Sequence, residues 1–211
     1  SWGLVENSYL GARASEAALY ALKSPKILHL ATHSFFLPQS EIGDFSSSLI
    51  TQHSSLLQSP MQRSVLALAG AQITLDAWEK GRIPPTDNDG VVTAQEVGGL
   101  DLQGTWIVAL SGCDTGSGEA RAGEGVLGLR RGFIQAGAEN LLMTLWPVGD
   151  TQTVQIIQDF YNQALRTGNA PQALADVQRN WLIKLRQEKG LSMAVRLAGP
   201  FILSFQGQPG R

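Results

Sequence analysis

Apolar and polar positions follow two rhythms along the chain, and together these rhythms predict an α/β fold. Residues 27–32 and 105–110 form nearly continuous apolar runs, and the first run is interrupted by the polar residue His29. Such runs are typical of parallel strands that are covered on both faces. Shorter apolar runs predict further strands at residues 65–68, 141–146 and 201–205.

Between these strands, apolar residues recur three or four positions apart, which indicates helices. The spacing predicts helices over residues 15–23, 93–97 and 126–137, followed by two longer helices that begin near residues 150 and 170. The first of the longer helices is expected to bury Val154, Ile157, Tyr161 and Leu165. The second is expected to bury Leu174, Val177, Trp181 and Leu185. Strands that alternate with helices favour a mainly parallel sheet with helices on both faces.

Two stretches lack either rhythm and are predicted to be loops. Residues 35–62 are rich in Ser and Gln, and we interpret them as a long variable loop that contains at most a short strand at residues 54–57. A glycine-rich loop is predicted from residue 112 to residue 123. Long loops inside a compact domain are usually functional or mobile.

Composition limits the classes of protein to which the chain can belong. Its 211 residues favour a single domain over residues 1–211, and the formal net charge of −2 argues against nucleic acid or a membrane surface as a partner. We find no apolar run long enough to cross a bilayer and no signal peptide. One cysteine excludes an internal disulfide and favours a reducing, cytoplasmic location. Because the chain starts with Ser rather than Met, we expect it to be the C-terminal part of a longer protein.

Two residues that can carry chemistry follow directly on predicted strands. His33 comes after residues 27–32, and Cys113 comes soon after residues 105–110. In α/β sheets the active cleft lies beyond the carboxyl ends of the strands, so both side chains are expected at one rim if these strands are parallel neighbours. A thiolate is a strong nucleophile, and a nearby imidazole can activate it. Each residue taken alone is also compatible with a purely structural role.

Several segments of the chain resemble the CHAT family of caspase-like domains, which often follow tetratricopeptide repeats. The resemblance spans about residues 14–205. Its histidine motif is Ile27-Leu28-His29-Leu30-Ala31-Thr32-His33, and its cysteine motif is Leu110-Ser111-Gly112-Cys113-Asp114-Thr115-Gly116. The segments at residues 123–129 and 137–148, and the run that begins at Asp89-Gly90, also resemble the family.

This resemblance implies a caspase-like three-layer sandwich and a cysteine endopeptidase that acts through His33 and Cys113. It places Ser34, where relatives commonly have glycine, and Gly112 at the backbone of an oxyanion site. Asp114 and Glu124 are the candidates for binding a basic P1 side chain by charge pairing. The implied partners are a protein or peptide substrate and an upstream repeat domain or regulatory protein, in the cytoplasm of a bacterial cell.

No cofactor or metal is predicted. His29 and His33 lack a third ligand placed with them, which makes zinc improbable. Residues 123–128 fit the dinucleotide fingerprint G-x-G-x-x-G, which leaves a nucleotide-binding oxidoreductase as one alternative. However, the fingerprint should follow its strand at once, so we interpret these glycines as helix entry and close helix–sheet packing. A second alternative is a catalytically inactive CHAT-type module that binds a partner protein.

Overall fold

A four-stranded sheet forms the centre of the molecule. The computed structural model describes residues 7–36, 59–85, 87–111, 122–146, 148 and 150–206, with the backbone alone for residues 122–126 and 150. The strand order is β1-β5-β6-β7, in which β1 pairs parallel with β5, and β5 with β6, whereas β7 is antiparallel to β6. The sheet is therefore mainly parallel, as the sequence predicts. The strands are β1 (Ile27–Ala31), β5 (Ile107–Ser111), β6 (Asn140–Thr144) and β7 (Phe201–Phe205).

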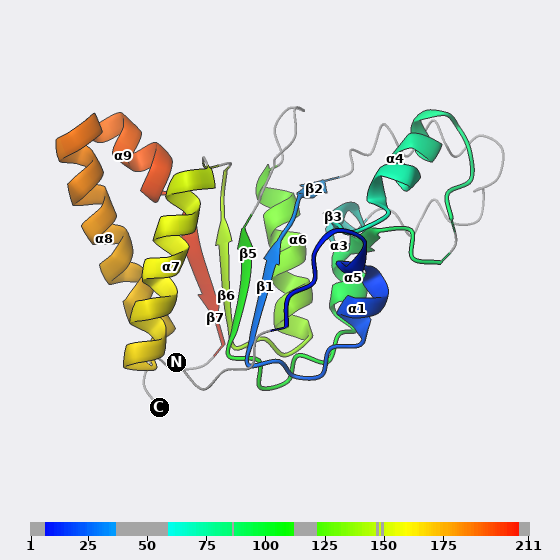
Figure 1. The fold of residues 1–211 in the computed structure, drawn as a ribbon, viewed down its shortest axis with the longest axis horizontal. Helices are drawn as coiled ribbons and strands as arrows, with labels where there is room; N and C mark the ends of the chain where they lie inside the picture. The colour runs from blue at the N-terminus through cyan, green and yellow to red at the C-terminus, as the bar shows by residue number, and fades with distance from the viewer. Residues whose placement is uncertain are drawn as a thin grey trace.

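Helices cover both faces of this sheet and complete the three layers of an α/β sandwich (Figure 1). One face packs against α1 (Glu16–Tyr20), α5 (Ala94–Val97) and α6 (Ala122–Gln135), with Leu28, Val108 and Leu141 in the shared core. The other face packs against α7 (Asp150–Thr167), α8 (Ala170–Lys189) and α9 (Leu191–Ala198), with Ile107, Ala109 and Leu142 in the core. Neighbouring residues of one strand point to opposite faces, so each apolar run supplies both cores.

A second, antiparallel sheet lies beside the first, and the sequence did not predict it. Its order is β2-β3-β4, formed by β2 (Ser34–Phe36), β3 (Ser64–Ala67) and β4 (Val91–Thr93). Two helices accompany it, α3 (Pro60–Arg63) and α4 (Ala71–Glu79), and they lie at the end of the molecule opposite α8 (Figure 1). From α4, Ala71 and the partly buried Trp78 pack on β3 and β4. A short 3-10 turn, η1 (Gly11–Arg13), precedes α1.

The turn at Asp89-Gly90 joins α1 to this second sheet. Gly90 has a φ of +80°, and a Cβ there would lie 2.8 Å from the backbone Cα of Ala71. The Gly90 N–H donates to the buried carboxylate of Glu16, and the Asp89 carbonyl accepts from Thr74 Oγ1 at 2.6 Å. Only glycine fits this backbone conformation and this close approach. The motif at Asp89-Gly90 is thus a structural joint.

The glycines of α6 bring this helix close to its neighbours. Gly128 faces Ser64 and Pro60, and Gly132 faces the backbone of Ala94. Because α6 begins at residue 122, all three glycines of the G-x-G-x-x-G pattern lie inside the helix rather than in a turn before it. This arrangement confirms the close packing predicted at Gly128, and it removes the basis for a dinucleotide site.

The prediction for α8 is confirmed and that for α7 is partly wrong. On α8, Leu174, Val177, Trp181 and Leu185 are all buried, and Pro171 stands in the first turn. On α7 the buried residues are Ile156, Ile157, Phe160 and Ala164, whereas Val154 is 53% exposed because it lies off this stripe. Leu165 is only partly buried.

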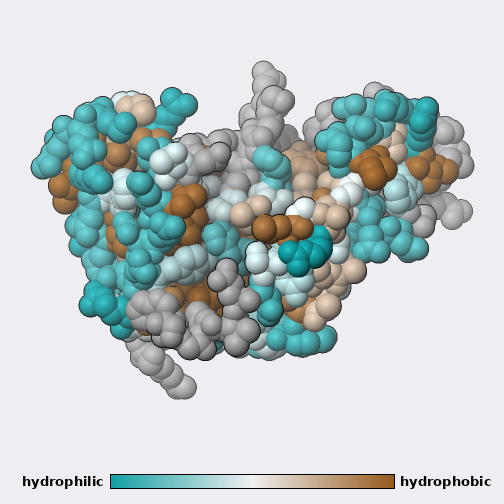
Figure 2. All heavy atoms as spheres, in the orientation of Figure 1, coloured by the Kyte–Doolittle hydropathy of each residue, from teal (hydrophilic) through white to brown (hydrophobic). Residues whose placement is uncertain are grey.

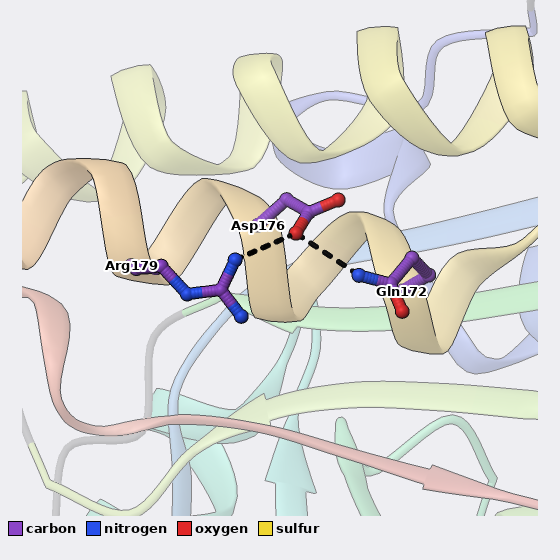
Figure 3. Close-up of polar contacts among 3 residues, drawn as sticks. All are labelled: Gln172, Asp176 and Arg179. Carbon is purple, nitrogen blue, oxygen red and sulfur yellow. Dashed lines mark hydrogen bonds and ion pairs between the residues drawn. The ribbon is translucent and has the colours of Figure 1, made fainter.

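The outer surface of α7 and α8 is mostly hydrophilic (Figure 2). On α8, Asp176 accepts hydrogen bonds from Gln172 Nε2 at 2.9 Å and from Arg179 Nη1 at 3.1 Å (Figure 3). These partners lie four and three residues away, which is the spacing at which side chains of one helix meet. This face of α8 is therefore a solvated surface opposite its apolar stripe.

Other differences concern the ends of elements and the loops. The first helix ends at Tyr20, three residues earlier than predicted, and α9 was not predicted at all. The predicted loop 35–62 begins within β2 and ends within α3, while residues 37–58, including the possible strand at 54–57, lie outside the described residues. The same holds for residues 112–121 of the glycine-rich loop.

Candidate functional site

The two strands that precede His33 and Cys113 lie side by side. Strands β1 and β5 are parallel and in register from Ile27↔Ile107 to Ala31↔Ser111, so both end at the same edge of the sheet. His33 follows β1 by two residues and is exposed. The structure thus confirms the arrangement of strands on which the predicted site depends.

The backbone at His33 is fixed by the second sheet. After β1 the chain crosses directly into β2, and the His33 carbonyl accepts a hydrogen bond from the Ala67 N–H at 2.9 Å. Next to it, the Thr32 hydroxyl donates to the Ala67 carbonyl. The end of β3 therefore holds both residues, so the exposed imidazole projects from an anchored backbone.

Ser34, predicted as an oxyanion residue, is the first residue of β2. It pairs with Leu66 of β3 in an antiparallel ladder, and the bond from Ala67 N–H to His33 carbonyl flanks this pair. Antiparallel pairs alternate between hydrogen-bonded and non-hydrogen-bonded pairs, so Ser34↔Leu66 is of the second kind. The Ser34 N–H is consequently directed away from β3, toward the outer side of β2, which is an edge strand. Its side chain is half-buried.

The remaining predicted site residues lie outside the described residues. This group comprises Gly112, Cys113 and Asp114, which follow β5 in the sequence, and the side chain of Glu124, whose backbone lies in the first turn of α6. The pairing of Cys113 with His33 therefore stays a prediction. What the structure describes on that side is the strand that leads to Cys113, as far as Ser111.

Sequence reasoning missed a polar contact between the two strand ends. His29 Nε2 and Ser111 Oγ lie 2.8 Å apart, and the ring of Tyr161 on α7 lies 5.8 Å from the His29 ring, centroid to centroid. Residue His29 is exposed, yet partial desolvation of its ring lowers its pKa. Strand alternation was the available signal, because it places residues 29, 109 and 111 on one face once the register is known.

A groove of about 550 Å³ opens between α7 and α8 rather than at the ends of β1 and β5. Several of its polar groups bond to one another, among them Arg166 and Gln163 at 2.6 Å. Trp181 Nε1 donates to Asp159 Oδ2 at 2.8 Å, and Lys184 Nζ lies 4.6 Å from the centroid of the Trp181 ring. Nothing in this groove resembles a reactive constellation.

The described part of the chain contains neither a metal-binding cluster nor a membrane-spanning helix. In that part, no three or more His, Cys, Asp or Glu side chains are grouped so that they can hold a metal ion. Among the same residues, no helix has both the length and the apolar character required to cross a bilayer.

Comparison with known proteins agrees with the fold. Human tetratricopeptide repeat protein 28 is 33% identical over 89 residues, which cover 42% of this chain. The chain spans about 4% of the length of that relative. The CHAT domain family, which is related to caspase-like cysteine peptidases, matches residues 3–198, nearly the whole chain. The chain therefore belongs to the CHAT family.

Proposed function

We propose that this domain is a cysteine endopeptidase in which His33 and Cys113 form the catalytic pair. The observation that carries the proposal is the parallel, in-register pairing of β1 with β5, which end together at Ala31 and Ser111. His33 and Cys113 each follow these ends by two residues in the sequence. Membership of a family related to caspase-like peptidases supports the same reaction class.

The chemistry assigned to the pair is acyl transfer through a thiolate. The His33 imidazole accepts the thiol proton of Cys113, and the sulfur then bonds to the carbonyl carbon of the scissile peptide. The C–N bond breaks, and the imidazolium delivers its proton to the departing amine. Water then attacks the thioester, and its proton returns through His33 to the sulfur, which releases the carboxylic acid.

Backbone N–H groups are the proposed stabilisers of the oxyanion that forms on the carbonyl oxygen. The candidates are the N–H of Ser34, which is directed away from β3, and the N–H of Cys113 beside Gly112. Fixed backbone donors of this kind commonly contribute a factor of about 100–1,000 to the rate. Because Ser34 is not glycine, its half-buried side chain narrows the space beside this donor.

The proposed substrate is a peptide segment of another protein with a basic P1 side chain, which Asp114 and Glu124 would bind by charge pairing. A repeat domain or regulatory protein is the proposed partner that controls access. The similarity to a tetratricopeptide repeat protein supports a repeat domain in that role. We propose the cytoplasm as the location, since the single cysteine is then kept as a thiol.

The test exploits the single cysteine, because iodoacetamide labelling followed by mass spectrometry reports on Cys113 alone. We expect faster labelling than for a free thiol at neutral pH, and cleavage of members of a peptide library that contain Lys or Arg. Cys113→Ala and His33→Ala should abolish cleavage without altering thermal unfolding. His53→Ala serves as the matched histidine control and should cleave normally.

Inert Cys113 in the folded protein, or cleavage that survives Cys113→Ala, overturns the proposal. If peptides are not cleaved and the two variants still capture the same partner proteins as the wild type, the inactive interaction module is the better description.

A further inference from the structure

Two different sets of contacts hold the ends of β1 and β5 at the proposed site. On the β1 side, the end of β3 holds Thr32 and His33 through their contacts with Ala67. On the β5 side, the last described residue is Ser111, and its hydroxyl bonds to His29 Nε2 at 2.8 Å. This contact joins β1 to β5 at their final paired position, beyond what the backbone ladder provides.

Register explains why these two side chains meet. His29 pairs with Ala109, and Ser111 lies one step further along β5 on the same face, so the two residues are diagonal neighbours. A histidine reaches this diagonal because its Nε2 lies far from the backbone, whereas the serine hydroxyl is short. The contact therefore depends on both residue types.

Residue His29 is exposed, and Tyr161 of α7 packs beside its ring. The Tyr161 ring lies 5.8 Å from it at an interplanar angle of 54°, and Phe160 lies 5.6 Å from Tyr161 in turn. The Tyr161 hydroxyl is buried and has no hydrogen-bond partner among the described residues, so Tyr161 acts on His29 through its ring. Desolvation lowers the pKa of His29 and so favours the neutral imidazole, which can donate to or accept from a hydroxyl.

We propose that His29 is a positioning residue that acts through Ser111 to hold the end of β5, and thereby sets how Cys113 meets His33. The inference rests on the proposed function. His29 does not touch the reacting atoms in this scheme. Its effect reaches Cys113 along the chain, since Ser111 precedes Cys113 by two residues. Small displacements of a reacting group can reduce rates substantially. Loss of the hydrogen bond between His29 and Ser111 should therefore be measurable as a slower reaction of Cys113.

The test measures the rate of iodoacetamide labelling of Cys113 as a function of pH. In His29→Phe the ring can still pack against Tyr161 but the nitrogen is lost, and Ser111→Ala removes the other partner. Each variant should label about tenfold more slowly near pH 7. The inflection of the pH profile should also move up toward the value of an unperturbed thiol, about 8.5.

Three further variants separate positioning from general structure. His29→Gln carries an amide at the reach of Nε2 and should restore most of the rate. The double variant His29→Phe/Ser111→Ala should be no slower than either single variant, because both remove one contact. Tyr161→Phe keeps the ring and removes only the unpartnered hydroxyl, so it should behave as the wild type.

Wild-type labelling rate and pH profile in Ser111→Ala or His29→Phe would overturn the inference, as would additive losses in the double variant. A failure of the proposed function gives a different result: Cys113 is then unreactive toward iodoacetamide, or its labelling rate does not change in His33→Ala. If the labelling rate of Cys113 depends on His33 but not on His29, only the positioning role is refuted.

Discussion

Replacement of Gly128 by alanine tests the close approach of α6 to β3. A Cβ at this position would overlap Ser64 Oγ and would lie 2.7 Å from Ser64 Cβ and 2.8 Å from the Pro60 carbonyl oxygen. Carbon atoms normally stay about 3.5–4.0 Å from such neighbours. The helix must therefore move by about 1 Å, or Ser64 must leave a site where it is fully buried and bonded to Pro60 at 2.7 Å.

Two opposing effects set the magnitude of the change. Alanine improves the helix propensity of an interior position by about 1 kcal/mol. Overpacking costs about 1–3 kcal/mol, and the backbone oxygen of Pro60 places Gly128 at the upper end of that range. We expect a net loss of about 2 kcal/mol in the free energy of unfolding, which corresponds to a drop in Tm of about 4–8 °C.

Urea denaturation of the wild type and Gly128→Ala measures the effect. The partner variant Ser64→Gly removes two of the three overlapping atoms, so the double variant should recover at least about 1 kcal/mol of the loss predicted from the sum of the single variants. If Gly128→Ala is as stable as the wild type or more stable, the helix propensity dominates, and the packing argument is wrong.

Two other predictions concern the joint at Gly90 and one concerns a helix cap. Gly90→Ala should lower the free energy of unfolding by about 3 kcal/mol or more, because φ is +80° and the added Cβ meets the backbone of Ala71; urea denaturation at wild-type stability would contradict this. Burial raises the pKa of the Glu16 carboxyl above its value in the unfolded chain, so the folded state binds more protons between these two values and stability falls as the pH rises through that range. Glu16→Gln should flatten this slope in denaturation series at successive pH values, and an unchanged slope would assign it to other groups. Thr93→Ala breaks the capping box with Glu96 and should lower the free energy of unfolding by about 1 kcal/mol, measured by urea denaturation. A loss of less than a few tenths of a kcal/mol would show that α5 does not depend on its cap.

The parts of the fold that sequence predicts well are those in which one face of an element is buried continuously. Strands β1 and β5 and the apolar stripe of α8 are of this kind, and so their positions agree with the structure. The orientation of β7 was not predictable, because Phe201–Phe205 is an apolar run that fits either direction. The α7 stripe was placed one step out of phase, since Val154 and Ile156 are equally apolar in the sequence.

The second sheet escaped prediction for a different reason. Strands β2 and β4 contain three residues each, too few for an alternating pattern to be recognised. In the candidate site too, one feature could be predicted from the sequence and another could not. The sequence places His33 correctly beyond β1, but the bond between His29 and Ser111 joins residues 82 positions apart and depends on the register of their two strands, which no local pattern reveals.

The direct crossing from β1 into β2 places His33 in the short connection between the two sheets. No linker separates the parallel sheet from the antiparallel one at this point, since Thr32 and His33 alone connect β1 to β2. If the small sheet rotates or slides relative to the large one, the main-chain torsion angles of these two residues must absorb the motion. The position of the imidazole therefore depends on how the two sheets are placed relative to each other, and a displacement of α3 or α4 reaches it through β3 and the hydrogen bonds of Ala67.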